Sequence, residues 1–210
     1  MIPSGPPTHL SMIRGFHLAD FFTLANAACG VLAVFAVMGY VETRELHRLL
    51  TATALIPVAL VFDVLDGRVA RWRMKHSAMG RELDSLADVI SFGVAPAAIA
   101  YGAGMKGGWD VLILVYFVAC GVSRLARFNA TAAELADEVT GKVKYFEGTP
   151  IPTSIAIVAL LSIAVLQDRT DERLWLGVMQ LGPALLHPLV LIYGLSGSAM
   201  ISATLRVPKP

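Results

Sequence analysis

The chain has 210 residues, a formal net charge of +1 and only 16% charged residues. Soluble globular domains usually carry about 25% charged residues, and the apolar residues here form long blocks, which excludes an ordinary soluble core. The sequence has no basic arm and no interleaving of basic and aromatic residues, so nothing indicates nucleic-acid binding. Both cysteines lie inside apolar blocks, as small buried side chains often do, and no disulfide framework is indicated.

Six apolar blocks follow one another along the chain, each of about the length that a bilayer core requires. They cover approximately residues 21–41, 49–71, 83–103, 109–128, 151–167 and 174–204. We therefore predict an all-α integral membrane bundle of six transmembrane helices. Residues 1–20 form an N-terminal extension, for which an interfacial helix is one possibility, and residues 205–210 form a tail.

Basic residues gather in the connections on one side of the predicted spans. The connection between the second and third blocks carries Arg68, Arg71, Arg73, Lys75 and Arg81. Connections that are rich in Lys and Arg generally stay in the cytoplasm. This pattern predicts a multi-pass protein of the cell membrane with both termini and this basic connection on the cytoplasmic side.

Four aspartates border the basic connection. Asp63 and Asp66 end the second block, and Asp84 and Asp88 begin the third. An ionisable side chain deep in a bilayer costs about 2.5–3.5 kcal/mol on insertion scales, so four of them need a compensating partner. Spacings of three and four residues place each pair on one helix face, and a short connection makes the two helices antiparallel. We predict one site, with Asp63 and Asp88 deeper than the other two, that binds a hard divalent cation and, through it, a phosphate.

Small and basic residues accompany the aspartates. Gly67 and Ala70 continue the stripe of the first pair along its helix, and Gly80 continues the stripe of the second pair. Small residues at such positions either let a ligand approach the helix backbone or allow close helix packing. Arg71 lies at the predicted mouth of the site, where a guanidinium is well placed to bind phosphate.

Together these positions form the pattern D-x-x-D-G-x-x-A-R-x(8)-G-x-x-x-D-x-x-x-D, from Asp63 to Asp88. It resembles the signature of the CDP-alcohol phosphotransferases at every fixed position and every gap. The resemblance implies a homodimeric membrane enzyme that transfers the lipid phosphate of a CDP-lipid to an alcohol and releases CMP.

The same resemblance implies roles for the residues of the pattern. Asp63, Asp66 and Asp84 would bind two divalent cations, Mg²⁺ or Mn²⁺. Asp88 would be the general base of the reaction, with a share in metal binding. The remaining four positions would line the pocket for the nucleotide and the diphosphate: Gly67, Ala70, Arg71 and Gly80.

Four further stretches resemble the phosphatidylserine synthase branch of the family, at residues 22–30, 83–96, 123–129 and 145–152, although Thr149 stands where Leu or Met is more usual. Charge offers a separate argument, because serine needs one cation and one acceptor, whereas a polyol phosphate needs several cations. A mixed set that suits an amino acid comprises Arg124, Arg127, Asn129, Lys144 and Glu147. Alternatively, these residues are ordinary loop charges and arginines whose side chains reach from the membrane to the polar surface. Asn26 in the first block either faces the site or makes an interhelical hydrogen bond.

The leading hypothesis is therefore transfer from a CDP-lipid such as CDP-diacylglycerol to L-serine, in phospholipid biosynthesis. The same chemistry with a polyol or polyol phosphate acceptor is the alternative. A cation transporter is a more distant one, because intramembrane carboxylates also line ion paths. The apolar second half of the third block, residues 95–103, argues against such a path.

Overall fold

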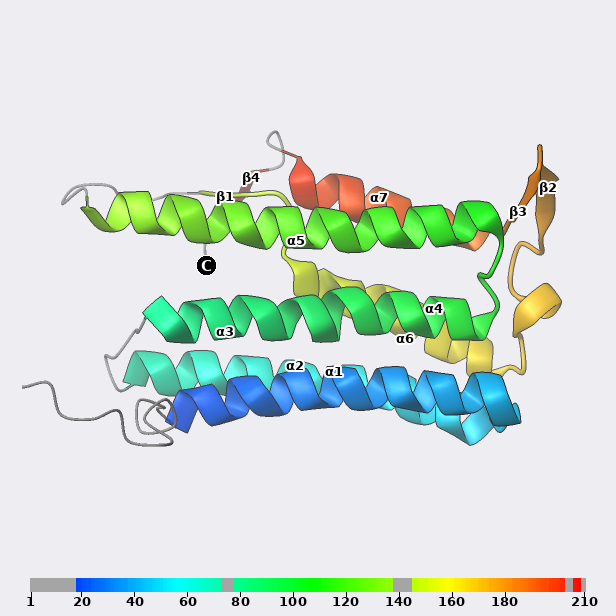
Figure 1. The fold of residues 1–210 in the computed structure, drawn as a ribbon, viewed down its shortest axis with the longest axis horizontal. Helices are drawn as coiled ribbons and strands as arrows, with labels where there is room; N and C mark the ends of the chain where they lie inside the picture. The colour runs from blue at the N-terminus through cyan, green and yellow to red at the C-terminus, as the bar shows by residue number, and fades with distance from the viewer. Residues whose placement is uncertain (1–17, 73–77, 138–144, 203–205, 209–210) are drawn as a thin grey trace, which may run out of the picture.

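The fold is taken from a computed structural model that describes residues 18–72, 78–137, 145–202 and 206–208. Long helices lie side by side along the longest axis of the molecule (Figure 1). The start of α1, the end of α2 and the start of α3 lie at one end of this bundle, and the connections α1–α2 and α4–α5 lie at the other (Figure 1). Most of the predicted N-terminal extension lies outside the described residues.

Four helical segments are long and apolar enough to cross a membrane, within the described parts of the chain: residues 19–43, 46–69, 79–103 and 108–130. The first two belong to α1 (Leu18–Thr43) and α2 (Leu46–Trp72), and the fourth belongs to α5 (Gly108–Asp137). The third is one continuous helix that consists of α3 (Ala78–Asp88), the π-helical segment η2 (Val89–Val94) and α4 (Ala95–Ala103). The predicted first four spans are thus confirmed as helices, and the chain is a multi-pass membrane protein.

The last two predicted spans are represented by shorter apolar helices. The fifth consists of the 3-10 turn η3 (Ile151–Thr153) followed by α6 (Ser154–Leu166). The sixth consists of the 3-10 turn η5 (Pro188–Val190) followed by α7 (Leu191–Ile201). Neither reaches the length of the first four, so six crossings remain a prediction.

The first half of the predicted sixth span is wrong, because residues 174–187 are not a continuous helix. After a 3-10 turn, η4 (Asp171–Arg173), the chain forms an antiparallel hairpin of β2 (Met179–Leu181) and β3 (Ala184–Leu186). Gly182 has a φ of 62°, a conformation that favours glycine, and Pro183 lacks the N–H that a helix would need. A second strand pair joins β1 (Tyr145–Glu147) to β4 (Arg206–Pro208), so the fold is mostly but not entirely helical.

The core lies between the helices, and the outer faces are apolar. Ile56, Ile99 and Leu161 are completely buried, on α2, α4 and α6. The Tyr193 ring of α7 meets Phe117 of α5 edge-on at 5.1 Å, and its hydroxyl donates to the Pro96 carbonyl at 3.0 Å. Large apolar side chains are also exposed on the outer faces of the helices, as expected for surfaces that contact lipid tails: Leu32, Phe35, Val61, Leu112 and Val115.

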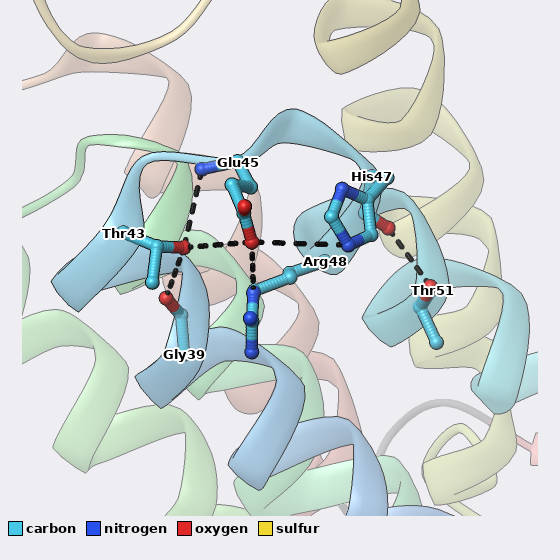
Figure 2. Close-up of polar contacts among 6 residues, drawn as sticks. All are labelled: Gly39, Thr43, Glu45, His47, Arg48 and Thr51. Carbon is cyan, nitrogen blue, oxygen red and sulfur yellow. Dashed lines mark hydrogen bonds and ion pairs between the residues drawn. The ribbon is translucent and has the colours of Figure 1, made fainter.

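Polar contacts fix the two-residue connection between α1 and α2 (Figure 2). The Thr43 hydroxyl donates to the Gly39 carbonyl at 2.8 Å, and Arg48 Nε donates to Glu45 Oε2 at 2.6 Å. Arg44 has a φ of 59°, in the left-handed region, which lets the chain reverse direction here. The hydrogen bond from Arg48 holds the pKa of Glu45 below its ordinary value.

An ion cluster ties three connections together at this end of the bundle. Asp171, just before the hairpin, pairs with Arg44 at 2.6 Å and with Lys106 at 3.1 Å. Gly104 ends α4 with a φ of 133°, and a Cβ there would lie 2.5 Å from the Asp171 Cα. Burial raises the pKa of Asp171, but hydrogen bonds and charges from Lys106 and Arg44 outweigh burial and lower it below the ordinary 3.8.

Candidate active site

Three aspartate carboxylates from two helices converge at the end of the bundle opposite the hairpin. Asp63 and Asp66 come from α2 and Asp84 comes from α3, and one oxygen of each lies within 4.8 Å of the others. Asp66 is only 6% exposed, and the other two are half-buried. Oxygen donors in this spacing fit a hard divalent cation, so the carboxylate triad could hold one.

Asp88 lies beside this triad, one turn further along α3. It is 7% exposed and within electrostatic reach of the other three carboxylates. Asn26 of α1 donates from Nδ2 to Asp88 Oδ1 at 3.4 Å. Asn26 therefore both faces the site and makes an interhelical hydrogen bond, the two roles that the sequence had offered as alternatives. Its Oδ1 is buried and has no hydrogen-bond partner among the described residues, so a polar acceptor remains available beside Asp88.

The chain changes from α- to π-helix immediately after Asp88. The π-helical segment η2 packs closely on α1, where a Cβ at Gly30 would lie 2.8 Å from the Ser91 Cα. The Ser91 hydroxyl donates to the Asn26 carbonyl at 2.8 Å. Short π-helical segments inside α-helices often occur at functional sites. Here the segment fixes α1 against the aspartate-bearing helix.

Two residues on α1 belong to the site although the sequence analysis missed them. The Thr23 hydroxyl donates to Asp66 Oδ2 at 2.8 Å, in a buried contact. Asp20 is buried and close enough to Asp66 to act on it electrostatically. A signal was available, because Asp20, Thr23 and Asn26 follow one another at three-residue intervals on a largely apolar helix.

The predicted nucleotide residues are only partly described. Gly67 follows Asp66 on α2, Gly80 lies one turn before Asp84 on α3, and both are half-buried. Ala70 and Arg71 belong to the last turn of α2, but their side chains lie outside the description.

Arg124 of α5 is the predicted acceptor residue for which the described part of the chain gives an electrostatic interaction with Asp88. It is half-buried and within electrostatic reach of Asp88, and its Nε is buried without a hydrogen-bond partner in the described part of the chain. Arg127 is exposed on the same helix.

The other predicted acceptor residues are only partly described. Asn129 ties α5 to α3, since its Nδ2 donates to Ser85 Oγ at 3.0 Å and to Glu82 Oε2 at 3.3 Å. Lys144 lies outside the described residues, and Glu147 is described only through its backbone in β1.

Residues 16–192 match the family model for CDP-alcohol phosphatidyltransferase. The chain belongs to this family. Several curated relatives are similar to it over most of its length. The CDP-diacylglycerol–serine O-phosphatidyltransferase of Saccharomyces cerevisiae is 44% identical over 204 residues, which cover 96% of this chain and 74% of that protein.

Two other relatives match over shorter stretches. The CDP-diacylglycerol–serine O-phosphatidyltransferase of Mycobacterium bovis is 36% identical over 72% of this chain and 52% of that protein. The archaetidylserine synthase of Methanothermobacter thermautotrophicus is 36% identical over 68% of this chain and 56% of that protein. The chain thus spans little more than half the length of these two relatives.

Family membership shows that this chain is a transferase, and it explains why carboxylates gather at this site. The CDP-alcohol phosphatidyltransferases generally use a divalent metal, and the triad of Asp63, Asp66 and Asp84 offers the hard oxygen donors that such an ion prefers. Without a cation, three carboxylates that are partly buried and this close together would repel one another.

Proposed function

We propose that this chain transfers the phosphatidyl-type group of CDP-diacylglycerol, or a similar CDP-lipid, to the hydroxyl of L-serine and releases CMP. The observation that carries the proposal is the 44% identity, over 96% of the chain, to a protein named CDP-diacylglycerol–serine O-phosphatidyltransferase. The relative named archaetidylserine synthase supports a serine acceptor while leaving the lipid part of the donor open.

The carboxylates would bind the catalytic metal. We propose that Asp63, Asp66 and Asp84, with a contribution from Asp88, hold two divalent cations, Mg²⁺ or Mn²⁺. When bound, such cations would neutralise the charge of the diphosphate and the charge that develops on the attacking and leaving oxygens. Thr23 orients Asp66 for this task through its buried hydrogen bond.

Asp88 is the proposed general base. The serine hydroxyl oxygen forms a bond to the phosphorus on the lipid side, the bond from that phosphorus to the bridging oxygen breaks, and CMP leaves with both electrons of that bond. Asp88 accepts the hydroxyl proton, as a base within hydrogen-bond reach of the acceptor would. Its burial and its contact with Asn26 hold the carboxylate in one position beside the triad.

Arg124 is the proposed partner of the serine carboxylate. Its buried Nε lacks a hydrogen-bond partner in the described residues, and its guanidinium is within electrostatic reach of Asp88. A planar guanidinium binds a carboxylate with two hydrogen bonds, which suits an amino acid acceptor. Gly67, Ala70, Arg71 and Gly80 would contact the nucleotide and the diphosphate on the other side of the reacting phosphorus. Arg127, Asn129, Lys144 and Glu147 complete the proposed acceptor region.

The deciding assay measures CMP release from CDP-diacylglycerol by the purified protein in the presence of Mg²⁺ or Mn²⁺. L-serine, inositol, glycerol 3-phosphate and inositol phosphate are compared as acceptors. We expect release to depend on serine. Faster release with glycerol 3-phosphate or inositol phosphate would instead establish the polyol phosphate alternative.

Two variants test the residue roles. Asp88→Asn should abolish turnover while CDP-lipid binding largely survives, and normal turnover by this variant would refute the base assignment. Arg124→Gln should raise the KM for serine far more than the KM for the CDP-lipid. The control is Arg169→Gln, an exposed arginine in the connection that follows α6 and outside the proposed acceptor region, which should leave both constants near their original values.

We further propose that the aspartate end faces the cytoplasm and that the chain works as a homodimer. The basic connection between α2 and α3 supports this orientation. A membrane-impermeant maleimide should label Arg81→Cys only when the cytoplasmic side is accessible. Mass measurement of the purified protein would establish the number of copies.

A further inference from the structure

The hairpin β2–β3 exposes apolar side chains on both of its faces. Leu176, just before it, is 74% exposed, and four more large apolar residues of this segment are exposed: Val178, Met179, Leu181 and Leu185. Gln180 is the one polar residue in the two strands. An apolar surface of this kind facing bulk water would be unfavourable, so some other medium or partner covers it.

Contacts to α5 fix the depth of the hairpin. Trp109 donates from Nε1 to the Leu181 carbonyl at 2.8 Å, and a Cβ on Gly107 would collide with the Leu185 carbonyl. Where the hairpin ends, the buried Asp110 carboxylate accepts from the His187 backbone N–H at 2.7 Å and pairs with His187 Nδ1 at 2.6 Å. All of these partners belong to the first turn of α5 or directly precede it. The hairpin therefore sits at the level at which α5 enters the membrane.

The direction of the hairpin is also defined. Its strands stand crosswise to the long helices at the end of the bundle, beside α5 and the start of α7 (Figure 1). It consequently extends along the plane of the membrane surface. Leu112 and Val115 on the outer face of α5 are exposed, so the lipid-facing surface of this helix leads up to the hairpin.

The backbone of the hairpin limits how deep it can lie in the bilayer. It cannot lie at the bilayer centre, because the outer edges of its two strands carry backbone groups that need water or polar headgroups.

We propose that the β2–β3 hairpin inserts its exposed apolar side chains into the boundary between headgroups and acyl chains, in the leaflet away from the aspartates. The occupant of this surface is lipid. Trp109 fits the same boundary, where tryptophan side chains are enriched. In the preceding connection, on the proposed water side, Asp168 pairs with Arg173, and Asp171 pairs with Arg44 and Lys106 of the neighbouring turns.

Single-cysteine labelling of the full chain in phosphatidylcholine vesicles tests this proposal. Leu181→Cys and Leu185→Cys carry an environment-sensitive fluorophore, and Glu172→Cys in the preceding polar turn, which is also exposed, is the control. Cys29 and Cys120 are buried, and wild-type protein measures any labelling of them. Retained CMP release verifies that each variant is folded.

We expect the two hairpin labels to shift their emission to the blue and to be quenched more strongly by lipids spin-labelled near the headgroup than by lipids labelled near the chain end. The Glu172→Cys label should instead be quenched by iodide. Iodide quenching of the hairpin labels equal to that of the control would overturn the proposal. So would protection from both iodide and spin-labelled lipid, since a second copy or another protein would then cover the surface.

Discussion

Replacing Thr23 by valine removes one hydroxyl from the carboxylate site and leaves the shape of the side chain nearly unchanged. The hydroxyl has a single hydrogen and two acceptors nearby, Asp66 Oδ2 at 2.8 Å and the Ala19 carbonyl at 3.2 Å. The shorter contact to the charged oxygen is the stronger one. A hydrogen bond to a charged group contributes about 1.5–3 kcal/mol. Partners that orient metal ligands typically contribute about 10–100-fold in metal affinity or activity, which corresponds to a similar free energy.

We therefore expect Thr23→Val to raise the Mg²⁺ or Mn²⁺ concentration for half-maximal CMP release by about 10–100-fold. Thr53→Val is the matched control, because Thr53 is as buried as Thr23, at 5% against 4%, but donates to the Leu50 carbonyl of its own helix. Titration of both variants with metal, at saturating CDP-lipid and serine, gives the comparison. An unchanged metal dependence of Thr23→Val, or an equal shift in both variants, would refute the role of Thr23 in orienting Asp66.

Three further substitutions test the packing and the polar contacts around the site. Gly30→Ala should reduce both thermal stability and CMP release, because its Cβ would meet the η2 backbone, whereas Gly39→Ala should be tolerated, because the nearest atom there is the flexible end of Arg48. Tyr193→Phe should lower the free energy of unfolding by about 0.5–1.5 kcal/mol without changing the metal concentration for half-maximal activity. The pKa of Asp171 is lowered in the fold, so its ion pairs stabilise the protein above the ordinary pKa of 3.8, and this stability is lost as the pH falls through the lowered folded-state pKa. The difference in Tm between wild type and Asp171→Asn should accordingly be present at neutral pH and shrink in acid; a constant difference would contradict the assignment.

The aspartate site was predictable because its geometry is mostly local. Helical spacing alone puts Asp63 and Asp66 on one face and Asp84 and Asp88 on another, and a short connection brings the two faces together. In the structure Asp63, Asp66 and Asp84 form one group and Asp88 lies beside them. Counting residues along the two helices predicts only which aspartates lie deeper, so it could not give this grouping. The hydrogen bonds from Thr23 to Asp66 and from Asn26 to Asp88 join residues far apart in the chain, so no local pattern encodes them.

The hairpin was not predictable from hydropathy. Residues 174–187 are apolar enough to resemble part of a span, and composition does not distinguish a strand in the membrane boundary from a helix inside it. Only the turn residues Gly182 and Pro183 carried a signal, and both also occur inside membrane helices. Thr23 was missed for a different reason, because its contact with Asp66 joins residues 43 positions apart in the chain.

The distribution of polar groups along the third crossing separates group transfer from ion transport. Asp84 and Asp88 lie at its beginning, while α4, its second half, carries no charged residue and buries Ala95, Ile99 and Ala103 completely. An ion path would need polar side chains along that half as well, because a cation moving through an apolar segment loses its hydration without replacement. α4 therefore offers no charged route from the carboxylates toward the hairpin end. A site that opens to one side suits a substrate whose charged head binds at that end while its apolar tails remain in the bilayer, as a CDP-lipid would.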